Sequence, residues 1–206
     1  MNRSPGRRAE RQQKILAAAV RAFSRQGYHH CTVAQVAREA GVADGTIYLY
    51  FQNKEDLLVS AFRHVLESLF QRLDAEIAAI ADPLAKLRRL VEMHLELMEG
   101  DPDVASFLQF QLRQPETSVR TAISGPLGQY ARRIEAILEA GKAAGQIRTD
   151  VGTRMLRRLI FGAVDETVSA WLLRAGRGPL LPKAAPLLDV ILDGIRRPGS
   201  ACPGHP

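Results

Sequence analysis

The sequence predicts an all-α protein of about nine helices, and two observations carry that prediction. Apolar residues recur with a period near 3.6 almost throughout the 206 residues, whereas no alternating, strand-like pattern persists. Aromatic residues are few at 6%, while the hydrophobic and charged shares, 46% and 24%, are those of a globular chain. A chain of this length accommodates one large domain or two smaller ones, each with its own core.

Four helices are predicted in the first 80 residues. Gly27 and Gly41 end two of them, since glycine readily adopts the left-handed backbone that terminates a helix. Thr32 and Asn53 precede two others as N-caps, because their side chains satisfy free amides of the first turn. The predicted ranges are about 8–26, 32–40, 44–50 and 54–80.

Five more helices are predicted after residue 80. Two Asp-Pro pairs, beginning at Asp82 and Asp101, are typical helix starts, and Asp150 is expected to cap a third helix. Pro126 is expected to kink or split the helix that contains it. The predicted ranges are about 82–98, 101–113, 118–144, 150–175 and 182–197, followed by a disordered tail over 198–206.

The net charge of +6 belongs entirely to the first quarter of the chain. Of 28 basic and 22 acidic side chains, residues 1–54 hold nine and three, which leaves 19 of each sign in the remainder. A basic segment joined to a neutral one indicates a head that binds a polyanion. The nine basic residues are Arg3, Arg7, Arg8, Arg11, Lys14, Arg21, Arg25, Arg38 and Lys54.

Several classes of protein are disfavoured by what the sequence lacks. It contains no nucleophile elbow, phosphate-binding loop or dinucleotide fingerprint, so we expect no enzyme and no cofactor. His29, His30 and Cys31 are adjacent, a spacing unsuited to a metal site, so none is expected. Two cysteines, no apolar leader and no long apolar run favour a cytoplasmic protein without a membrane partner.

The most specific pattern is TVAQVAREAGVADGTIYLYF over residues 32–51. Two short helices that cross steeply at a tight turn need a small residue at the crossing, here Ala37, and a glycine in the turn, here Gly41. The pattern therefore predicts a helix-turn-helix that binds double-stranded DNA through its second helix. We expect contacts to base edges or phosphates from Thr32, Val33, Gln35, Asp44, Gly45, Thr46, Tyr48, Tyr50 and Lys54.

The first sixty residues resemble the DNA-binding domain of the TetR family of bacterial transcriptional regulators, most visibly in GVADGTIYLYF followed by NKEDLL. The resemblance implies an all-helical homodimer in which the N-terminal helices bind DNA and a larger C-terminal domain binds a small molecule. We accordingly expect a DNA-binding domain over residues 1–53, extending into the next helix to about 68. Residues 54–197 are expected to form the ligand-binding and dimerisation domain.

Bulky apolar side chains of the C-terminal half are able to line a pocket between helices. The stretches FLQFQLRQP, LEAGKAAGQIRTD and IFGAVDETVSAWLL also resemble the acyl-CoA-responsive repressors of fatty-acid degradation within the family. That resemblance implies a hydrophobic effector, with long-chain acyl-CoA as the preferred candidate. Basic groups, among them Arg132 and Arg133, are then candidates for the CoA phosphates. The expected effector residues are Leu66, Phe70, Met93, Leu97, Met98, Phe107, Phe110, Gln111, Arg113, Phe161 and Asp165.

The last two predicted helices carry wide apolar stripes, which indicate a four-helix interface between two copies of the chain. Asp165 and Glu166 interrupt one stripe, and the sequence leaves open whether they face a pocket or the interface. The expected interface residues are Met155, Leu159, Val164, Val168, Trp171, Leu188, Ile191, Leu192 and Ile195.

The hypothesis for the mechanism is a repressor that leaves a palindromic operator when the effector shifts the helix beginning at Lys54. Two alternatives stay open at this point. One is a multidrug sensor that binds lipophilic cations, with Asp165 and Glu166 as counter-charges, and the other is a DNA-binding protein without ligand control. The operator, the regulated genes, the effector and the sign of regulation are not encoded in any pattern that we find.

Overall fold

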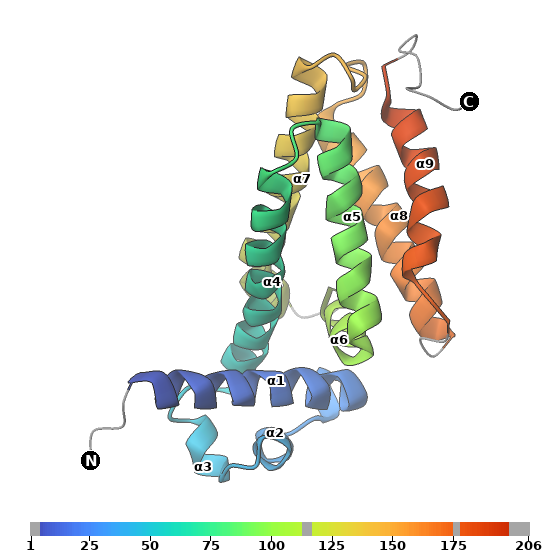
Figure 1. Cartoon of the computed structure of the whole chain (residues 1–206). Helices are drawn as coiled ribbons and strands as arrows, with labels where there is room; N and C mark the ends of the chain where they lie inside the picture. Colours follow the sequence, from blue (N-terminus) through green and yellow to red (C-terminus); the bar gives the residue numbers. More distant parts are fainter. Residues whose placement is uncertain (1–4, 113–116, 175–177, 198–206) are drawn as a thin grey trace. The chain divides into compact units, whose positions relative to one another are not determined.

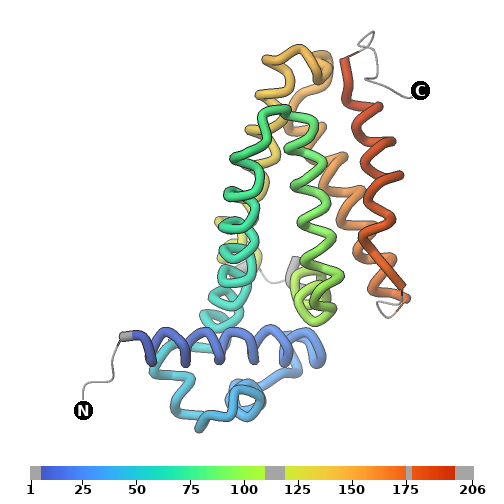
Figure 2. The backbone as a smooth tube through the Cα atoms, viewed as in Figure 1, coloured from blue at the N-terminus to red at the C-terminus, as the bar shows by residue number. Residues whose placement is uncertain are grey.

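The computed structural model describes residues 5–112, 117–174 and 178–197, and over these the chain is all-helical, as predicted (Figures 1 and 2). The one bridge between extended segments in this part joins Ile147 and Arg196. The predicted tail, 198–206, lies outside the described residues. The helices are α1 (Pro5–His30), α2 (Val33–Ala40), α3 (Asp44–Ile47), α4 (Lys54–Ala78), α5 (Pro83–Gly100), α6 (Pro102–Leu112), α7 (Thr117–Ala143), α8 (Thr153–Leu173), the 3-10 helix η1 (Leu181–Lys183) and α9 (Ala184–Ile195).

The predicted glycine stops have the backbone that they were expected to have. Gly27 interrupts α1 with φ 74° and ψ 156°, and Gly41 follows α2 with φ 64° and ψ 40°. The Thr32 hydroxyl accepts a hydrogen bond from the Gln35 amide, and the Gln35 side chain accepts one from the Thr32 amide. This capping box confirms Thr32 as the N-cap of α2.

Three local predictions need correction. The helix predicted over 44–50 is α-helical only to Ile47, because Leu49 and Tyr50 form tighter turns on Thr46 and Ile47. Asp150 does not cap α8, whose N-cap is Gly152, because its carboxylate pairs with Arg148 at 2.6 Å. Helix α7 is continuous through Pro126, so the predicted split is wrong, while the kink that was the other expectation stays a prediction.

The chain forms two compact units, and helices α4 and α7 each contribute to both. The first unit contains residues 1–68 and 101–126, so α6 belongs with α1, α2 and α3. Its core includes Phe23 of α1, Phe62 of α4 and Phe107 of α6, whose ring centroid lies 6.4 Å from that of Phe23 and 6.2 Å from that of Phe62. The sequence had not predicted this grouping of α6 with the N-terminal helices.

The second unit contains residues 69–100 and 127–206, with α5, α8 and α9 in mutual contact. Trp171 of α8 is buried in its core, and the indole Nε1 donates to the carbonyl of Gly178 at 2.9 Å. Arg88 of α5 pairs with Asp189 of α9 at 2.9 Å. Among the described helices none has both the length and the apolar character needed to cross a membrane.

Candidate DNA-binding surface and effector site

The helix-turn-helix of the first unit is held in shape by its turn and its buried face. Val36, Ala37 and Ala40 of α2 and Ile47 of α3 are buried. The Val42 amide donates to the Ala37 carbonyl at 2.9 Å, which closes the turn after Gly41. These contacts fix the position of α3 relative to α2. The distance between the first turns of the two helices is therefore set by the fold.

A surface hollow of about 400 Å³ lies where four helical segments of this unit meet. The sequence predicted five of its lining residues as DNA contacts and missed three, of which His29 and Cys31 were considered only as metal ligands and Ala34 was not considered. The lining residues are His29, Cys31, Thr32, Val33, Ala34, Asp44, Tyr48 and Lys54. Tyr48 is an exposed aromatic side chain of the hollow, with 58% of its surface accessible.

Lys54 supplies a fixed positive charge to the hollow. Its Nζ donates to the His29 carbonyl at 3.2 Å and lies 4.5 Å from the centre of the Tyr28 ring. Burial raises the pKa of the Cys31 thiol, and the nearby Lys54 charge opposes that shift in part. The thiol is therefore a packed, neutral group, while the ammonium is positioned for an anion such as a DNA phosphate.

The remaining predicted DNA contacts have different surroundings. Gly45 is exposed and a Cβ added there would meet no atom within 4 Å, whereas Thr46 is half-buried. Tyr50 is half-buried, with the Arg8 guanidinium 5.6 Å from its ring centre. The Gln35 side-chain oxygen is occupied by the capping box, so its first role is structural.

An aromatic cluster in the second unit is centred on Tyr130 of α7. Its ring stacks on Phe70 and meets Phe161 edge-on, with centroid distances of 6.3 Å in both cases. The Tyr130 hydroxyl lies 3.1 Å from Nδ1 of His94 in α5. Sequence reasoning selected Phe70 and Phe161 as effector residues but not Tyr130, since one tyrosine in a polar stretch of helix carries no local signal.

Both polar members of this cluster are buried. Burial lowers the pKa of His94 to about 4, with a smaller opposing effect from the negative charge of Asp165. Burial raises the pKa of Tyr130. The imidazole and the phenol are therefore neutral near pH 7. Asp165 is half-buried and its charge raises the pKa of His94, whereas Glu166 is exposed. The structure thus distinguishes two acidic residues that the sequence had treated alike.

The edge of the cluster carries a paired cation. The Arg133 guanidinium lies 4.1 Å from the centre of the Phe70 ring and binds Asp74 through two hydrogen bonds of 2.8 and 2.6 Å. This pair lowers the pKa of Asp74 and raises that of Arg133. Because its charge is already balanced, Arg133 is a poor candidate for the CoA phosphates that the sequence had suggested for it.

The other predicted effector residues are distributed over both units. Met93 and Met98 are buried and Leu97 is half-buried in the second unit, and their place in an effector site stays a prediction. Phe107 is part of the core that joins α6 to α1 in the first unit, where Leu66 is also buried, and the place of these two residues in an effector site likewise stays a prediction. The side chains of Phe110 and Gln111, and all of Arg113, lie outside the described residues.

The predicted dimer stripe is only partly available to a partner. Met155 and Leu159 of α8 are 51% and 58% exposed, Ile191 of α9 is half-buried, and Val190, which was not predicted, is 75% exposed. Six predicted residues instead form the core in which α8 and α9 pack on each other and on α5. These six are Val164, Val168, Trp171, Leu188, Leu192 and Ile195.

Comparison with known protein families covers both halves of the chain. The model for bacterial regulatory proteins of the TetR family matches residues 15–61, and the model for the C-terminal region of YsiA-like proteins, a TetR C-terminal model, matches residues 62–194. The chain belongs to the TetR family. It is a DNA-binding transcriptional regulator, as the helix-turn-helix predicted.

This TetR-family chain is similar along nearly its whole length to regulators of fatty-acid metabolism. It is 36% identical over 182 residues to the fatty acid metabolism regulator protein of Bacillus subtilis, covering 88% of this chain and 94% of that protein. The crystal structure of FadR from Bacillus subtilis in complex with stearoyl-CoA superposes with a TM-score of 0.85 at 36% identity, covering 89% and 98% of the two chains. The structure of FadR from Bacillus halodurans superposes with a TM-score of 0.85 at 35% identity, covering 89% of this chain and 99% of that chain.

Proposed function

We propose that this regulator is a homodimeric repressor that long-chain acyl-CoA releases from a palindromic operator. The observation that carries the proposal is the similarity, over 88–89% of the chain, to regulators of which one was crystallised with stearoyl-CoA. The excess of basic side chains within residues 1–54, the segment that contains the helix-turn-helix, agrees with DNA binding by this part of the chain.

The first unit supports phosphate binding next to base contacts. Lys54 and the helix starts at Thr32 and Asp44 line one hollow, and Tyr48 is exposed beside them. Phosphate contacts set the register of a protein on DNA, and side chains at the start of the second helix contact the base edges. In a two-fold dimer, two such units engage two half-sites of a palindrome.

The second unit supports an uncharged, apolar effector segment. Phe70 and Phe161 flank Tyr130, His94 is neutral, and Arg133 is already paired with Asp74. Asp165 adds a negative charge close to His94. A free carboxylate is therefore disfavoured in this cluster relative to the neutral thioester and chain of an acyl-CoA.

The effector acts only through a difference in affinity between two states. An acyl-CoA that binds the DNA-free state more tightly than the DNA-bound state lowers operator affinity by that ratio. The same linkage raises the thermal stability of the DNA-free protein, by about 2.7 kcal/mol at a hundredfold excess over Kd.

A thermal-shift experiment with four compounds tests the proposed effector. Stearoyl-CoA is expected to raise Tm by about 5–10 °C for a chain of this size, and stearate, CoA and a lipophilic cation are expected to raise it much less. Stabilisation by the cation alone contradicts the proposal and favours a multidrug sensor. Stabilisation by none of the four leaves the family assignment intact and removes the acyl-CoA proposal.

A matched pair of variants localises the effect. Phe161→Ala, at a half-buried position of the cluster, is expected to reduce the stearoyl-CoA shift by at least half. Ala170→Ser, at an exposed position of the same helix, is expected to leave the shift unchanged.

A further inference from the structure

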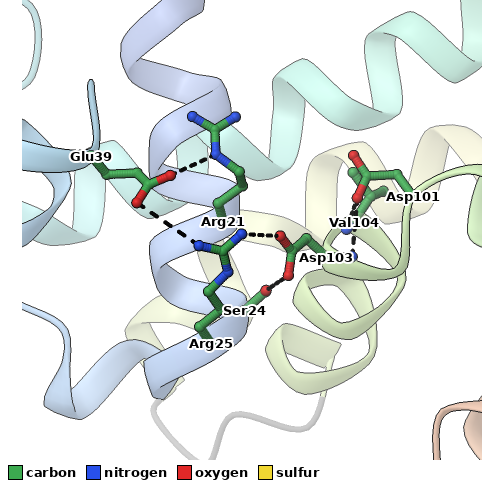
Figure 3. A network of polar contacts seen from close by, with 7 residues as sticks. All are labelled: Arg21, Ser24, Arg25, Glu39, Asp101, Asp103 and Val104. Carbon is green, nitrogen blue, oxygen red and sulfur yellow. Dashed lines mark hydrogen bonds and ion pairs between the residues drawn. The ribbon is translucent and has the colours of Figure 1, made fainter. Parts of the chain in front are cut away.

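A chain of polar contacts connects three helices of the first unit, and nothing in the DNA-binding surface requires it (Figure 3). Arg21, Ser24 and Arg25 share one face of α1, as residues three and four positions apart do. Arg25 lies between a carboxylate of α6, Asp103, and a carboxylate of α2, Glu39, at 3.1 and 4.0 Å. We call Asp103, Ser24, Arg25, Arg21 and Glu39 the α6–α2 relay.

Each end of the relay is fixed by further contacts. The Ser24 hydroxyl donates to Asp103 at 2.6 Å, and the Arg21 Nε donates to Glu39 at 2.8 Å. The carboxylate of Asp101 accepts hydrogen bonds from the amides of Asp103 and Val104, which holds the first turn of α6 in place (Figure 3). Asp103 is therefore presented to α1 by a capped helix start rather than by a free loop.

An apolar contact runs parallel to the relay. Phe107, one turn after Asp103 in α6, stacks on Phe23 of α1, the neighbour of Ser24. Helix α6 therefore contacts α1 with a ring and a carboxylate at once. A shift of α6 moves the Asp103 carboxylate, which competes with Glu39 for Arg25. Glu39 belongs to α2, and the hydrogen bond from Val42 to Ala37 connects the end of α2 to the start of α3.

The chain passes from the second unit into the first between Gly100 and Asp101, directly before α6. A change in the second unit therefore has a covalent route to the capped end that carries Asp103. We propose that Asp103 is a positioning residue that couples α6 to the DNA-binding helices through Arg25 and Glu39. Its role in the response to acyl-CoA rests on the proposed function, whereas its effect on DNA affinity does not.

A double-mutant cycle on DNA affinity tests the relay without any effector. The probe is a fluorescent duplex selected from random sequence by the wild-type protein, and the variants are Asp103→Asn, Glu39→Gln and the double variant. Asp103 and Glu39 meet only through Arg25, so the effect of the double variant is expected to differ from the product of the single effects by at least threefold. Multiplicative effects within error would overturn the relay.

Glu10→Gln is the matched control for charge, because it removes one negative charge from an exposed position of α1. It is expected to change the duplex Kd by less than twofold in every background. Part-exposed ion pairs contribute little to stability, so the relay variants are expected to fold. Arg25→Met, which cuts both contacts and keeps the side-chain stem, is the second variant and is expected to reproduce the loss of coupling.

A second readout measures the response to stearoyl-CoA as the ratio of duplex Kd with and without the ligand. Asp103→Asn is expected to reduce that ratio at least fivefold while the Kd of the DNA-free protein for stearoyl-CoA stays within twofold of wild type. An unchanged ratio in Asp103→Asn overturns the coupling role and leaves the proposed function standing. A wild-type protein that stearoyl-CoA does not release contradicts the proposed function, and the double-mutant cycle then decides the relay alone.

Discussion

Single residues of this protein take their roles from neighbours that are distant in the sequence. Lys54 begins α4, yet its ammonium contacts the His29 carbonyl and the Tyr28 ring at the end of α1. His94 and Tyr130 are 36 positions apart and share one buried hydrogen bond. Such side chains are positioned before any ligand arrives, which reduces the entropy that binding must overcome.

Replacement of Lys54 tests the phosphate-binding role of the hollow. Lys54→Met is expected to weaken binding to all duplexes by a similar factor and to reduce the slope of log K against log salt concentration by about one. Fluorescence anisotropy over a salt series measures both. Lys86→Met removes the same charge from α5, and an equal change of slope in that variant would contradict the assignment.

Replacement of His94 tests the neutral state of the aromatic cluster. Below pH 6.5 the unfolded chain protonates this histidine, whereas the folded chain does so only near pH 4. The free energy of unfolding therefore falls by about 1.4 kcal/mol per pH unit as the pH decreases through this window. His94→Gln is expected to lose that part of the pH dependence in urea unfolding curves, and His30→Gln, at an exposed position, is expected to keep it.

At the scale of the elements, local signals predicted the structure wherever local chemistry determines it. Gly27, Gly41 and Thr32 act through backbone conformation and capping within a few residues, and the sequence predicted all three. Asp150 failed as a cap because a nearby arginine, Arg148, competes for its carboxylate. Contacts such as Arg25 with Asp103, 78 positions apart, have no local signature and were not predicted.

Two glycines of the helix-turn-helix separate stability from DNA binding. Gly41→Ala forces an alanine to φ 64°, and we expect it to lower the free energy of unfolding by about 1 kcal/mol. Gly45→Ala adds a methyl group in open space on α3, so stability is expected to stay the same while duplex affinity falls, because Gly45 is one of the predicted DNA contacts. Urea unfolding and anisotropy give the two readouts, and equal losses of stability in both variants would contradict this account.

At the scale of the whole molecule, the sequence predicted the fold class but overestimated the surface that is open to a second copy. An apolar stripe at helical spacing marks a buried face without saying whether the same chain or a partner buries it. Trp171 and Leu188 belong to the protomer's own core, and the exposed large apolar side chains of α8 and α9 are Met155, Leu159, Leu173 and Val190.

The exposed apolar side chains of α8 lead to a prediction about the oligomeric state. Leu159→Glu places a charge on the exposed face of α8 and is expected to convert the proposed dimer to a monomer in sedimentation analysis. The monomer is expected to bind a palindromic duplex at least tenfold more weakly, since only one half-site is engaged. Ala136→Glu, at an exposed position of α7, is the control, and a dimer that persists in Leu159→Glu would exclude this face.

The central claim is that binding of an acyl-CoA lowers the affinity of this regulator for DNA. The most direct measurement is the affinity of the full-length wild-type protein for its selected duplex, by anisotropy, with increasing stearoyl-CoA and, in parallel, with stearate and with CoA. The account predicts that stearoyl-CoA raises the duplex Kd at least tenfold while stearate and CoA change it little. A duplex Kd that stays constant at saturating stearoyl-CoA would contradict it.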